Sequence, residues 1–316
     1  SFLMIRRPPR STLLDIRRQR QMCIRDRFPP IPTPFGADGA VEHQALTANL
    51  ERWNQSDLSG YVVLGSNGEA PYLDLEEKVG VWDVARRVIP EDRVMIAGTG
   101  YESTRRTIAV TRLAAKAGAD VALVVTPHYY GPQMTPDILV DYYRAVADGS
   151  PVPIIVYNVP KFTGVNVDAV TLARLSEHTN IIGVKDTSGN IIQIADTVRL
   201  ASPQFQVLAG SASFLFAGLA VGAVGGILAL ANIAPLQAID IYRLFDKGWW
   251  EEAAALQRRM LPVNAAVTSG FGIAGLKAAL DMLGYYGGPV RKPLVDLDEK
   301  KRQALRSVLA EGGVLK

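Results

Sequence analysis

The chain has 316 residues, 48% of them hydrophobic and 21% charged, which is enough for one or two domains with a large core. No uninterrupted apolar stretch approaches the roughly 18 residues that span a bilayer, so we expect a soluble, cytoplasmic protein with no membrane partner. The formal net charge of +3 is concentrated at the N-terminus: residues 1–27 hold eight arginines and two acids, whereas the remainder has 26 basic and 29 acidic residues. This balance argues against a nucleic-acid partner.

Residues 1–27 show no helical or strand period that would bury an apolar face. Their Arg-rich, acid-poor composition is typical of a transit peptide. The strings MIRRPPRST and MCIRDR also resemble translated sequencing adapter fused to a truncated gene, and this is the explanation we favour. In either case we expect this leader to lie outside the fold. It contains Cys23, the only cysteine, so the rest of the chain has no disulfide, thiolate nucleophile or cysteine-bound metal.

From Pro29 onward, short β-branched runs alternate with amphipathic helical stretches, most of them at the roughly 30-residue spacing of a βα unit. The predicted strands are Pro30–Thr33, Tyr61–Leu64, Val94–Ala97, Val121–Val125, Pro153–Tyr157, Ile181–Lys185, Gln206–Ala209 and Gly225–Leu228.

Eight such units predict a (β/α)8 TIM barrel over residues 28–245. A doubly wound open sheet is the alternative, but it would normally carry a Gly-rich fingerprint after its first strand, and Thr33-Pro34-Phe35 is not one. Between the strands, Asp74 and Glu77 form the pattern of a helix-capping box. The pattern after Arg243 is helical only, which predicts a C-terminal helical extension over residues 246–316.

Lys185 ends a buried strand, and catalytic residues of such barrels stand at the strand ends. A lysine in this position often simply reaches solvent. In a desolvated pocket, however, the neutral amine is favoured and can attack a ketone to form a Schiff base. Tyr157 ends the preceding strand, where it could move protons for such an amine. The pairing of these two residues favours the catalytic interpretation.

The turn Gly65-Ser66-Asn67-Gly68-Glu69 places two polar residues between glycines at another strand end. Its backbone amides and the Ser66 hydroxyl could converge on an anion such as a carboxylate, although a tight βα turn without a ligand has the same composition. The three histidines lie apart with no metal-ligand spacing, so we expect neither a metal nor any other cofactor.

The chain from about Phe28 onward resembles the dihydrodipicolinate synthase and N-acetylneuraminate lyase superfamily of Schiff-base aldolases. The resemblance rests on five segments in the family's order and spacing: Thr33-Pro34-Phe35, GSNGE at 65–69, VVTPHYY at 124–130, VYNVP at 156–160 and GVKD at 183–186.

This resemblance implies that Lys185 forms the Schiff base and that Tyr157 is the general acid and base. Ser66 and Tyr129 would complete a proton relay, with Tyr129 supplied by a neighbouring subunit of a homodimer or homotetramer. The resemblance also implies that Ser66 and Asn67 bind the substrate carboxylate and that the Ile227 carbonyl lies near the lysine. Gly68, Thr187, Gly210 and Ser211 stand at strand ends and are further candidates for substrate binding, with Thr187 and Ser211 at the distal part of the substrate.

The substrate is the open question. Dihydrodipicolinate synthases usually carry an arginine where this chain has Phe162, which cannot bind a carboxylate, and the adjacent Lys161 is expected to point elsewhere. Long segments, including 205–215, 222–232 and 264–294, are more similar to 4-hydroxy-2-oxoglutarate aldolases, which cleave their substrate to pyruvate and glyoxylate. Aldolases or dehydratases of 2-keto-3-deoxy sugar acids share the same core and remain alternatives, as does 4-hydroxy-tetrahydrodipicolinate synthase.

Overall fold

A computed structural model describes residues 27–315, in which eight parallel strands form one sheet. The strands are β1 (Arg27–Phe28), β2 (Gly60–Val63), β3 (Val94–Gly98), β4 (Val121–Val125), β5 (Ile154–Asn158), β6 (Ile181–Asp186), β7 (Gln206–Ala209) and β8 (Gly225–Ile227). Strand β1 pairs with β8, and the other strands pair in chain order. The residues after β1 close the ring on β2, since Val62 N–H donates to the Pro29 carbonyl and Ile31 N–H donates to the Val62 carbonyl. The predicted (β/α)8 barrel is confirmed.

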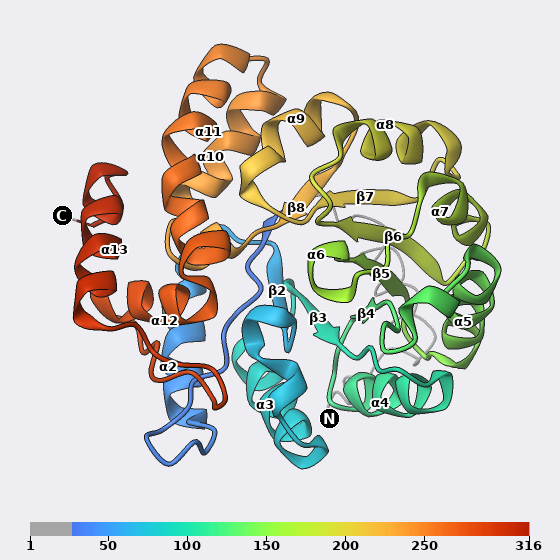
Figure 1. Cartoon of the computed structure of the whole chain (residues 1–316), viewed down its shortest axis with the longest axis horizontal. Coiled ribbons are helices and arrows are strands. Elements are labelled where there is room, and N and C mark those ends of the chain that lie inside the picture. The colour runs from blue at the N-terminus through green and yellow to red at the C-terminus, as the bar shows by residue number, and fades with distance from the viewer. Residues whose placement is uncertain (1–26, 316) are drawn as a thin grey trace, which may run out of the picture.

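Helices surround the strands (Figure 1). They are α2 (His43–Trp53), α3 (Leu75–Val88), α4 (Thr104–Lys116), α5 (Pro136–Gly149), α6 (Pro160–Thr163), α7 (Ala169–Ser176), α8 (Ile191–Leu200), α9 (Leu215–Ala220) and α10 (Pro235–Asp246). Short 3-10 helices lie at η1 (Ser66–Gly68), η2 (Ala70–Tyr72), η3 (Gly131–Gln133), η4 (Ala212–Phe214) and η5 (Ala229–Asn232). The expected capping box is present at α3, where Asp74 accepts from Glu77 N–H and Glu77 accepts in return from Asp74 N–H.

The chain ends in α11 (Trp250–Ala265), the π-helical segment η6 (Ala266–Gly270), α12 (Gly272–Met282) and α13 (Glu299–Glu311). These helices gather on the side of the barrel where α2 and α10 lie, as Figure 1 shows. The π-helical turn follows Pro262, which lies inside α11, and in it Phe271 N–H donates to the carbonyl of Ala266. Such turns often lie at functional sites, and this one lines the cavity described below.

The barrel interior is filled by side chains from nearly every strand, so it is a packed core and not a pore. Its buried members include Phe28, Val62, Ile96, Leu123, Ile155, Tyr157, Leu208 and Ile227. Alternate residues of the same strands face the helices and form the outer core layer; Val156 and Val184 belong to this layer. Because Tyr157 follows Val156, it points inward at the end of β5.

The prediction of a first strand at Pro30–Thr33 is wrong. The strand is Arg27–Phe28, and Pro30 makes only an isolated bridge to Val62. Proline has no N–H to donate, and three prolines in the sequence Pro29-Pro30-Ile31-Pro32 prevent a continuous hydrogen-bond ladder. A side chain substitutes for part of that ladder, since Asn232 Nδ2 donates to the carbonyl of Pro30 at 3.0 Å.

Residues 1–26 lie outside the described part of the chain, so the interpretation of the leader stays a prediction. Strand β1 begins at Arg27, the last residue assigned to that leader. Among residues 27–315, no helix has the length and apolar character required to cross a membrane.

Candidate active site

Lys185 and Tyr157 stand opposite each other on adjacent strands. The register pairs Tyr157 of β5 with Lys185 of β6, so their side chains leave the sheet on the same face. Both side chains are buried, with exposed fractions of 5% for Tyr157 and 3% for Lys185. The Lys185 amine nitrogen lies 4.1 Å from the centroid of the Tyr157 ring. Within residues 27–315, Lys185 forms no ion pair with an acid, which leaves its amine accessible for chemistry.

The neighbouring carboxylate is directed away from the lysine by its own hydrogen bonds. Asp186, which is buried, accepts from the Ser188 N–H at 2.7 Å and from Gln193 Nε2 at 2.8 Å. Asn158 Nδ2 donates to the same carboxylate at 3.1 Å. A buried carboxylate satisfied in this way has little tendency to neutralise the adjacent Lys185. The hydrogen bonds of Asn158 and Gln193 to this carboxylate were not predicted, because side-chain hydrogen bonds between separate elements leave no pattern in the chain.

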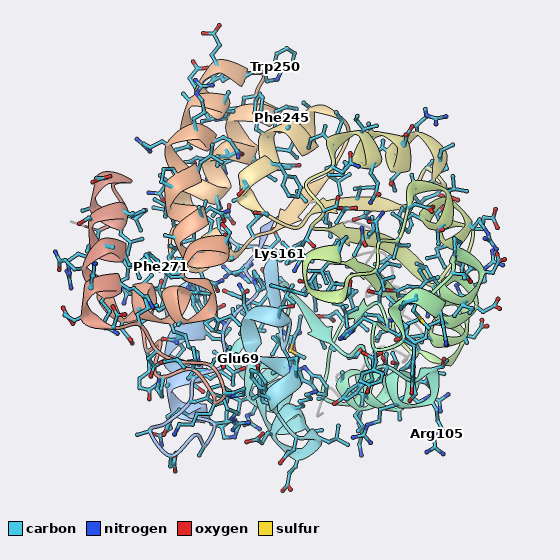
Figure 2. The ribbon with its side chains drawn as sticks, viewed as in Figure 1. Glu69, Arg105, Lys161, Phe245, Trp250 and Phe271 are labelled. Carbon is cyan, nitrogen blue, oxygen red and sulfur yellow. The ribbon has the colours of Figure 1, made fainter. Side chains whose placement is uncertain are left out.

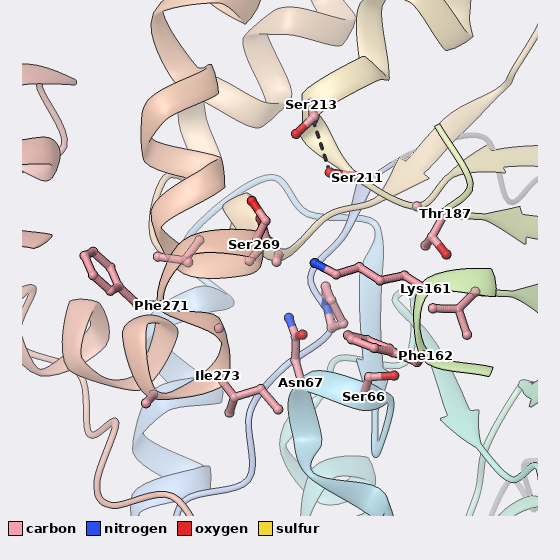
Figure 3. Close-up of a pocket in the computed structure, with 18 of the residues that line it drawn as sticks. Ser66, Asn67, Lys161, Phe162, Thr187, Ser211, Ser213, Ser269, Phe271 and Ile273 are labelled. Atoms are coloured by element: carbon pink, nitrogen blue, oxygen red, sulfur yellow. Dashed lines mark hydrogen bonds between the residues drawn. The ribbon is translucent and has the colours of Figure 1, made fainter. Parts of the chain in front are cut away.

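The turn after β2 supplies polar groups to the cavity that Lys185 also lines, and Figure 3 labels Ser66 and Asn67 there. Ser66 Oγ lies 3.2 Å from the Tyr157 hydroxyl, which joins two of the three residues of the predicted relay. Asn67 Nδ2 is buried and has no hydrogen-bond partner in the described structure. Both residues line the cavity, so the Asn67 amide is a donor available for a ligand. Gly68 is buried beneath the turn, where its carbonyl accepts from Thr33 Oγ1 at 2.7 Å.

A cavity of about 460 Å³ opens above these groups. Gly210, Ser211 and Thr187 line the side near β6 and β7, whereas Thr268 and Ser269 of the π-helical turn line the side of the C-terminal helices. Gly210 is required there, because a Cβ at this position would lie 2.0 Å from Thr187 Cγ2. Thr187 donates its hydroxyl hydrogen to the Asn158 carbonyl at 2.7 Å. The cavity volume of about 460 Å³ is typical of small-molecule sites.

The expectation that the Lys161 side chain points away from the site is wrong. It follows β5 on the single turn α6 and lines the cavity. Figure 3 shows its side chain extending across the cavity, with the amine directed toward Ser269. In Figure 2, Lys161 lies between α6 and the segment that carries Phe271. Phe162 also lines the cavity, with 65% of its surface exposed, and it has no group that could hold a carboxylate.

Three predicted site residues do not line this cavity: Gly68, Tyr129 and Ile227. Tyr129 is 77% exposed, and its ring packs edge-on against Tyr130 with the centroids 5.0 Å apart. Its loop is held by Glu102, which accepts hydrogen bonds from the N–H groups of both His128 and Tyr129. Ile227 is fully buried in the barrel interior on β8. Within the single chain, Tyr129 therefore lies apart from Tyr157 and Ser66.

A buried ion pair behind the Ser66 turn was not predicted from the sequence. Glu69 and Lys277 of α12 are 2.7 Å apart, and their side chains are 0% and 1% exposed. Glu69 also accepts from the Arg291 N–H at 2.8 Å, while Lys277 donates to the Pro289 carbonyl at 2.7 Å. Burial lowers the pKa of Lys277, and the Glu69 carboxylate opposes that shift.

This pair fixes the geometry of the turn. Glu69 has a left-handed backbone with φ of 54°, a conformation that costs free energy for a residue with a side chain. Its buried interactions with the C-terminal extension hold the residue there. The turn that carries Ser66 and Asn67 is thus tied to α12.

A parallel barrel whose mouth holds a buried amine beside a phenol has the architecture of an aldolase, a carbon–carbon lyase. Comparison with known proteins agrees. The model of the dihydrodipicolinate synthetase family matches residues 24–311. The 4-hydroxy-tetrahydrodipicolinate synthase of Methanothrix thermoacetophila is 37% identical over 285 residues, which are 90% of this chain and 95% of that relative.

Two solved structures are similar over the same length. A monomeric dihydrodipicolinate synthase variant has a TM-score of 0.88 and 31% identity, covering 92% of this chain and 98% of that one. YagE, a prophage protein of E. coli K12 in complex with pyruvate, has a TM-score of 0.86 and 27% identity, covering 92% and 99%. The chain belongs to the dihydrodipicolinate synthetase family, and it is a lyase.

The buried ion pair gives a stability prediction. Lys277→Met leaves the Glu69 carboxylate buried without its partner, and we expect a loss of about 3–5 kcal/mol in the free energy of unfolding. The double variant Glu69→Gln with Lys277→Met removes both charges and should recover most of that loss, as urea unfolding would measure. If the single and double variants were equally unstable, or if neither lost stability, the pair would not hold the turn.

Proposed function

We propose that this lyase cleaves a 4-hydroxy-2-oxo acid, with 4-hydroxy-2-oxoglutarate as the substrate and pyruvate and glyoxylate as the products. The observation that carries the proposal is the buried Lys185 amine facing Tyr157, in a cavity where Phe162 replaces the arginine of dihydrodipicolinate synthases. The pyruvate complex of YagE supports a 2-oxo acid as the ligand.

The reaction begins when the Lys185 amine attacks the C2 ketone to form a carbinolamine. The Tyr157 hydroxyl donates its proton to the departing hydroxyl group, which leaves as water, and the products are an iminium and the Tyr157 phenolate. Tyr157 then accepts the proton of the 4-hydroxyl group as the C3–C4 bond breaks. The bonding electrons move into the iminium, which becomes an enamine, and the aldehyde leaves. Protonation at C3 and hydrolysis release pyruvate and restore the amine. The Schiff base is formed with the substrate itself, so the proposal requires no cofactor.

Ser66 and Asn67 bind the C1 carboxylate in this scheme. The unpartnered Asn67 amide and the Ser66 hydroxyl both face the cavity beside Tyr157. Holding the carboxylate fixes the ketone relative to Lys185, which keeps the reacting atoms aligned. Ser66 also passes protons to and from Tyr157. Gly210 is a further substrate-facing position, whereas Gly68 and Ile227 lie behind the cavity wall.

Tyr129 completes the relay in a homodimer or homotetramer. A second cavity of about 620 Å³ adjoins the first and is lined by Ser66, Tyr157 and His128. Tyr129 projects from the surface, and the neighbouring Tyr130 is also 62% exposed. Entry of the partner's tyrosine into this second cavity would bring it to Ser66 and Tyr157.

A second function is favoured by the relatives. The Methanothrix relative is named a 4-hydroxy-tetrahydrodipicolinate synthase, an activity that would condense pyruvate with an amino-aldehyde. Phe162 weighs against it, since an aromatic ring offers no bidentate contact to that aldehyde's carboxylate. Dehydration of a 2-keto-3-deoxy sugar acid is a third possibility, because it uses the same iminium and expels a hydroxyl group.

A product analysis separates these functions. We expect 4-hydroxy-2-oxoglutarate to yield equal amounts of pyruvate and glyoxylate, with slower turnover of 2-keto-3-deoxygluconate. A dioxo acid with an unchanged number of carbons would identify a dehydratase. Consumption of pyruvate only in the presence of aspartate semialdehyde would identify the synthase. Either result, without glyoxylate formation, would contradict the proposal.

Tyr157 provides a test of the proton step. Tyr157→Phe keeps the ring beside Lys185 and removes the hydroxyl, so we expect kcat for cleavage to fall by about 10²- to 10⁴-fold. Tyr285→Phe is the matched control: that ring stacks on Trp53 with the centroids 5.2 Å apart, away from the cavity, and kcat should stay within two- to threefold of the unmodified protein's. An unchanged kcat in Tyr157→Phe would remove this residue from the mechanism.

A further inference from the structure

The far end of the cavity carries a positive charge that the cleavage reaction does not use. The side chains of Lys185 and Lys161 line the cavity, and no carboxylate from residues 27–315 lines it. Lys161 forms no ion pair with any residue from 27 to 315. Once Lys185 has formed the iminium, this group carries a positive charge beside that of Lys161, so the electrostatics of the cavity favour a ligand with more than one negative charge.

The position of Lys161 is fixed by the turn that carries it. Thr163 is buried and donates its hydroxyl to the Val159 carbonyl at 3.1 Å, and Gly164 ends the turn with φ of 65°. The Phe162 N–H also donates a hydrogen bond to the Val159 carbonyl, at 2.9 Å. With its base held in this way, the Lys161 side chain spans the cavity toward the π-helical turn (Figure 3).

Two serine hydroxyls near β7 are oriented as donors by one buried amide. Asn264 of α11, which is 1% exposed, donates through Nδ2 to Ser211 Oγ at 3.2 Å and to Ser213 Oγ at 2.8 Å. Ser211 Oγ also accepts from the Ser213 N–H at 3.2 Å. Because both oxygens act as acceptors here, their hydrogens remain for a ligand, and both serines line the cavity.

We propose that Lys161, with the Ser211 and Ser213 hydroxyls, forms a distal anion site that binds a second carboxylate of the substrate, at the end remote from the ketone. Asn264 is a positioning residue for the two hydroxyls. The site makes the enzyme selective for short 2-oxo dicarboxylates over 2-oxo acids with an uncharged end. This inference rests on the proposed function, in which Lys185 and the Ser66 turn hold the first carboxylate and the ketone.

Equilibrium binding tests the site without requiring cleavage. 2-Oxoglutarate has the carbon chain of the proposed substrate but no 4-hydroxyl group, and 2-oxopentanoate replaces its distal carboxylate with a methyl group. By isothermal titration calorimetry we expect the protein to bind 2-oxoglutarate about 10- to 100-fold more tightly than 2-oxopentanoate. Lys161→Met, which keeps most of the stem length and removes the charge, should abolish most of that preference.

Three variants make the result specific. Lys161→Arg keeps the charge and should retain a preference within a few-fold of the original. Ser213→Ala should weaken 2-oxoglutarate binding by a few-fold, because one of the donors is lost. Lys116→Met removes an exposed charge on α4 outside the cavity, and it should leave both affinities unchanged.

The outcomes separate this inference from the proposed function. Equal affinity for the two ligands, or a preference that survives in Lys161→Met, would overturn the distal site even if 4-hydroxy-2-oxoglutarate were cleaved. A preference that Lys161→Met abolishes would support the site even if another oxo dicarboxylate proved to be the substrate.

Discussion

The site depends on the buried amine of Lys185, which forms no ion pair with a carboxylate among residues 27–315. Lys185 is nearly inaccessible to solvent, and the acid beside it, Asp186, is held by hydrogen bonds to other groups. The amine of such a lysine can act as the nucleophile that attacks a ketone. The Lys185 nitrogen lies over the aromatic face of Tyr157, 4.1 Å from the ring centroid. The register between β5 and β6 pairs Tyr157 with Lys185, so the barrel places the phenol beside the amine.

The C-terminal helices are part of the site and do more than cover the barrel. The π-helical turn lines the cavity, Asn264 orients the hydroxyls at its far end, and Lys277 holds Glu69 behind the Ser66 turn. Sequence segments that lie far apart therefore converge on one cavity. Substrate choice can change through these helices and the α6 turn while Lys185 and Tyr157 stay in place.

Much of the fold followed from local pattern. Seven strands were placed to within about two residues, and the Asp74 cap was located correctly, because strand period and capping chemistry are local properties. The first strand was misplaced because a run of apolar residues and prolines looks extended without forming a ladder.

The grouping of Lys185, Tyr157 and Ser66 followed from the rule that catalytic residues stand at strand ends, and the geometry brings these three together. Lys161, Asn264 and the Glu69–Lys277 pair could not be predicted, since their roles come from contacts between distant segments. Tyr129 does not line the cavity of its own chain, so the predicted relay would require the tyrosine of a second subunit.

The central claim, that Lys185 is the nucleophile, is tested most directly by chemical trapping. The protein would be incubated with pyruvate, reduced with borohydride, digested and analysed by peptide mass spectrometry. We predict a single pyruvate-dependent adduct on the peptide that contains Lys185, and none on peptides that contain Lys161 or Lys277. An active protein with no adduct on Lys185, or with the adduct on another lysine, would contradict the account.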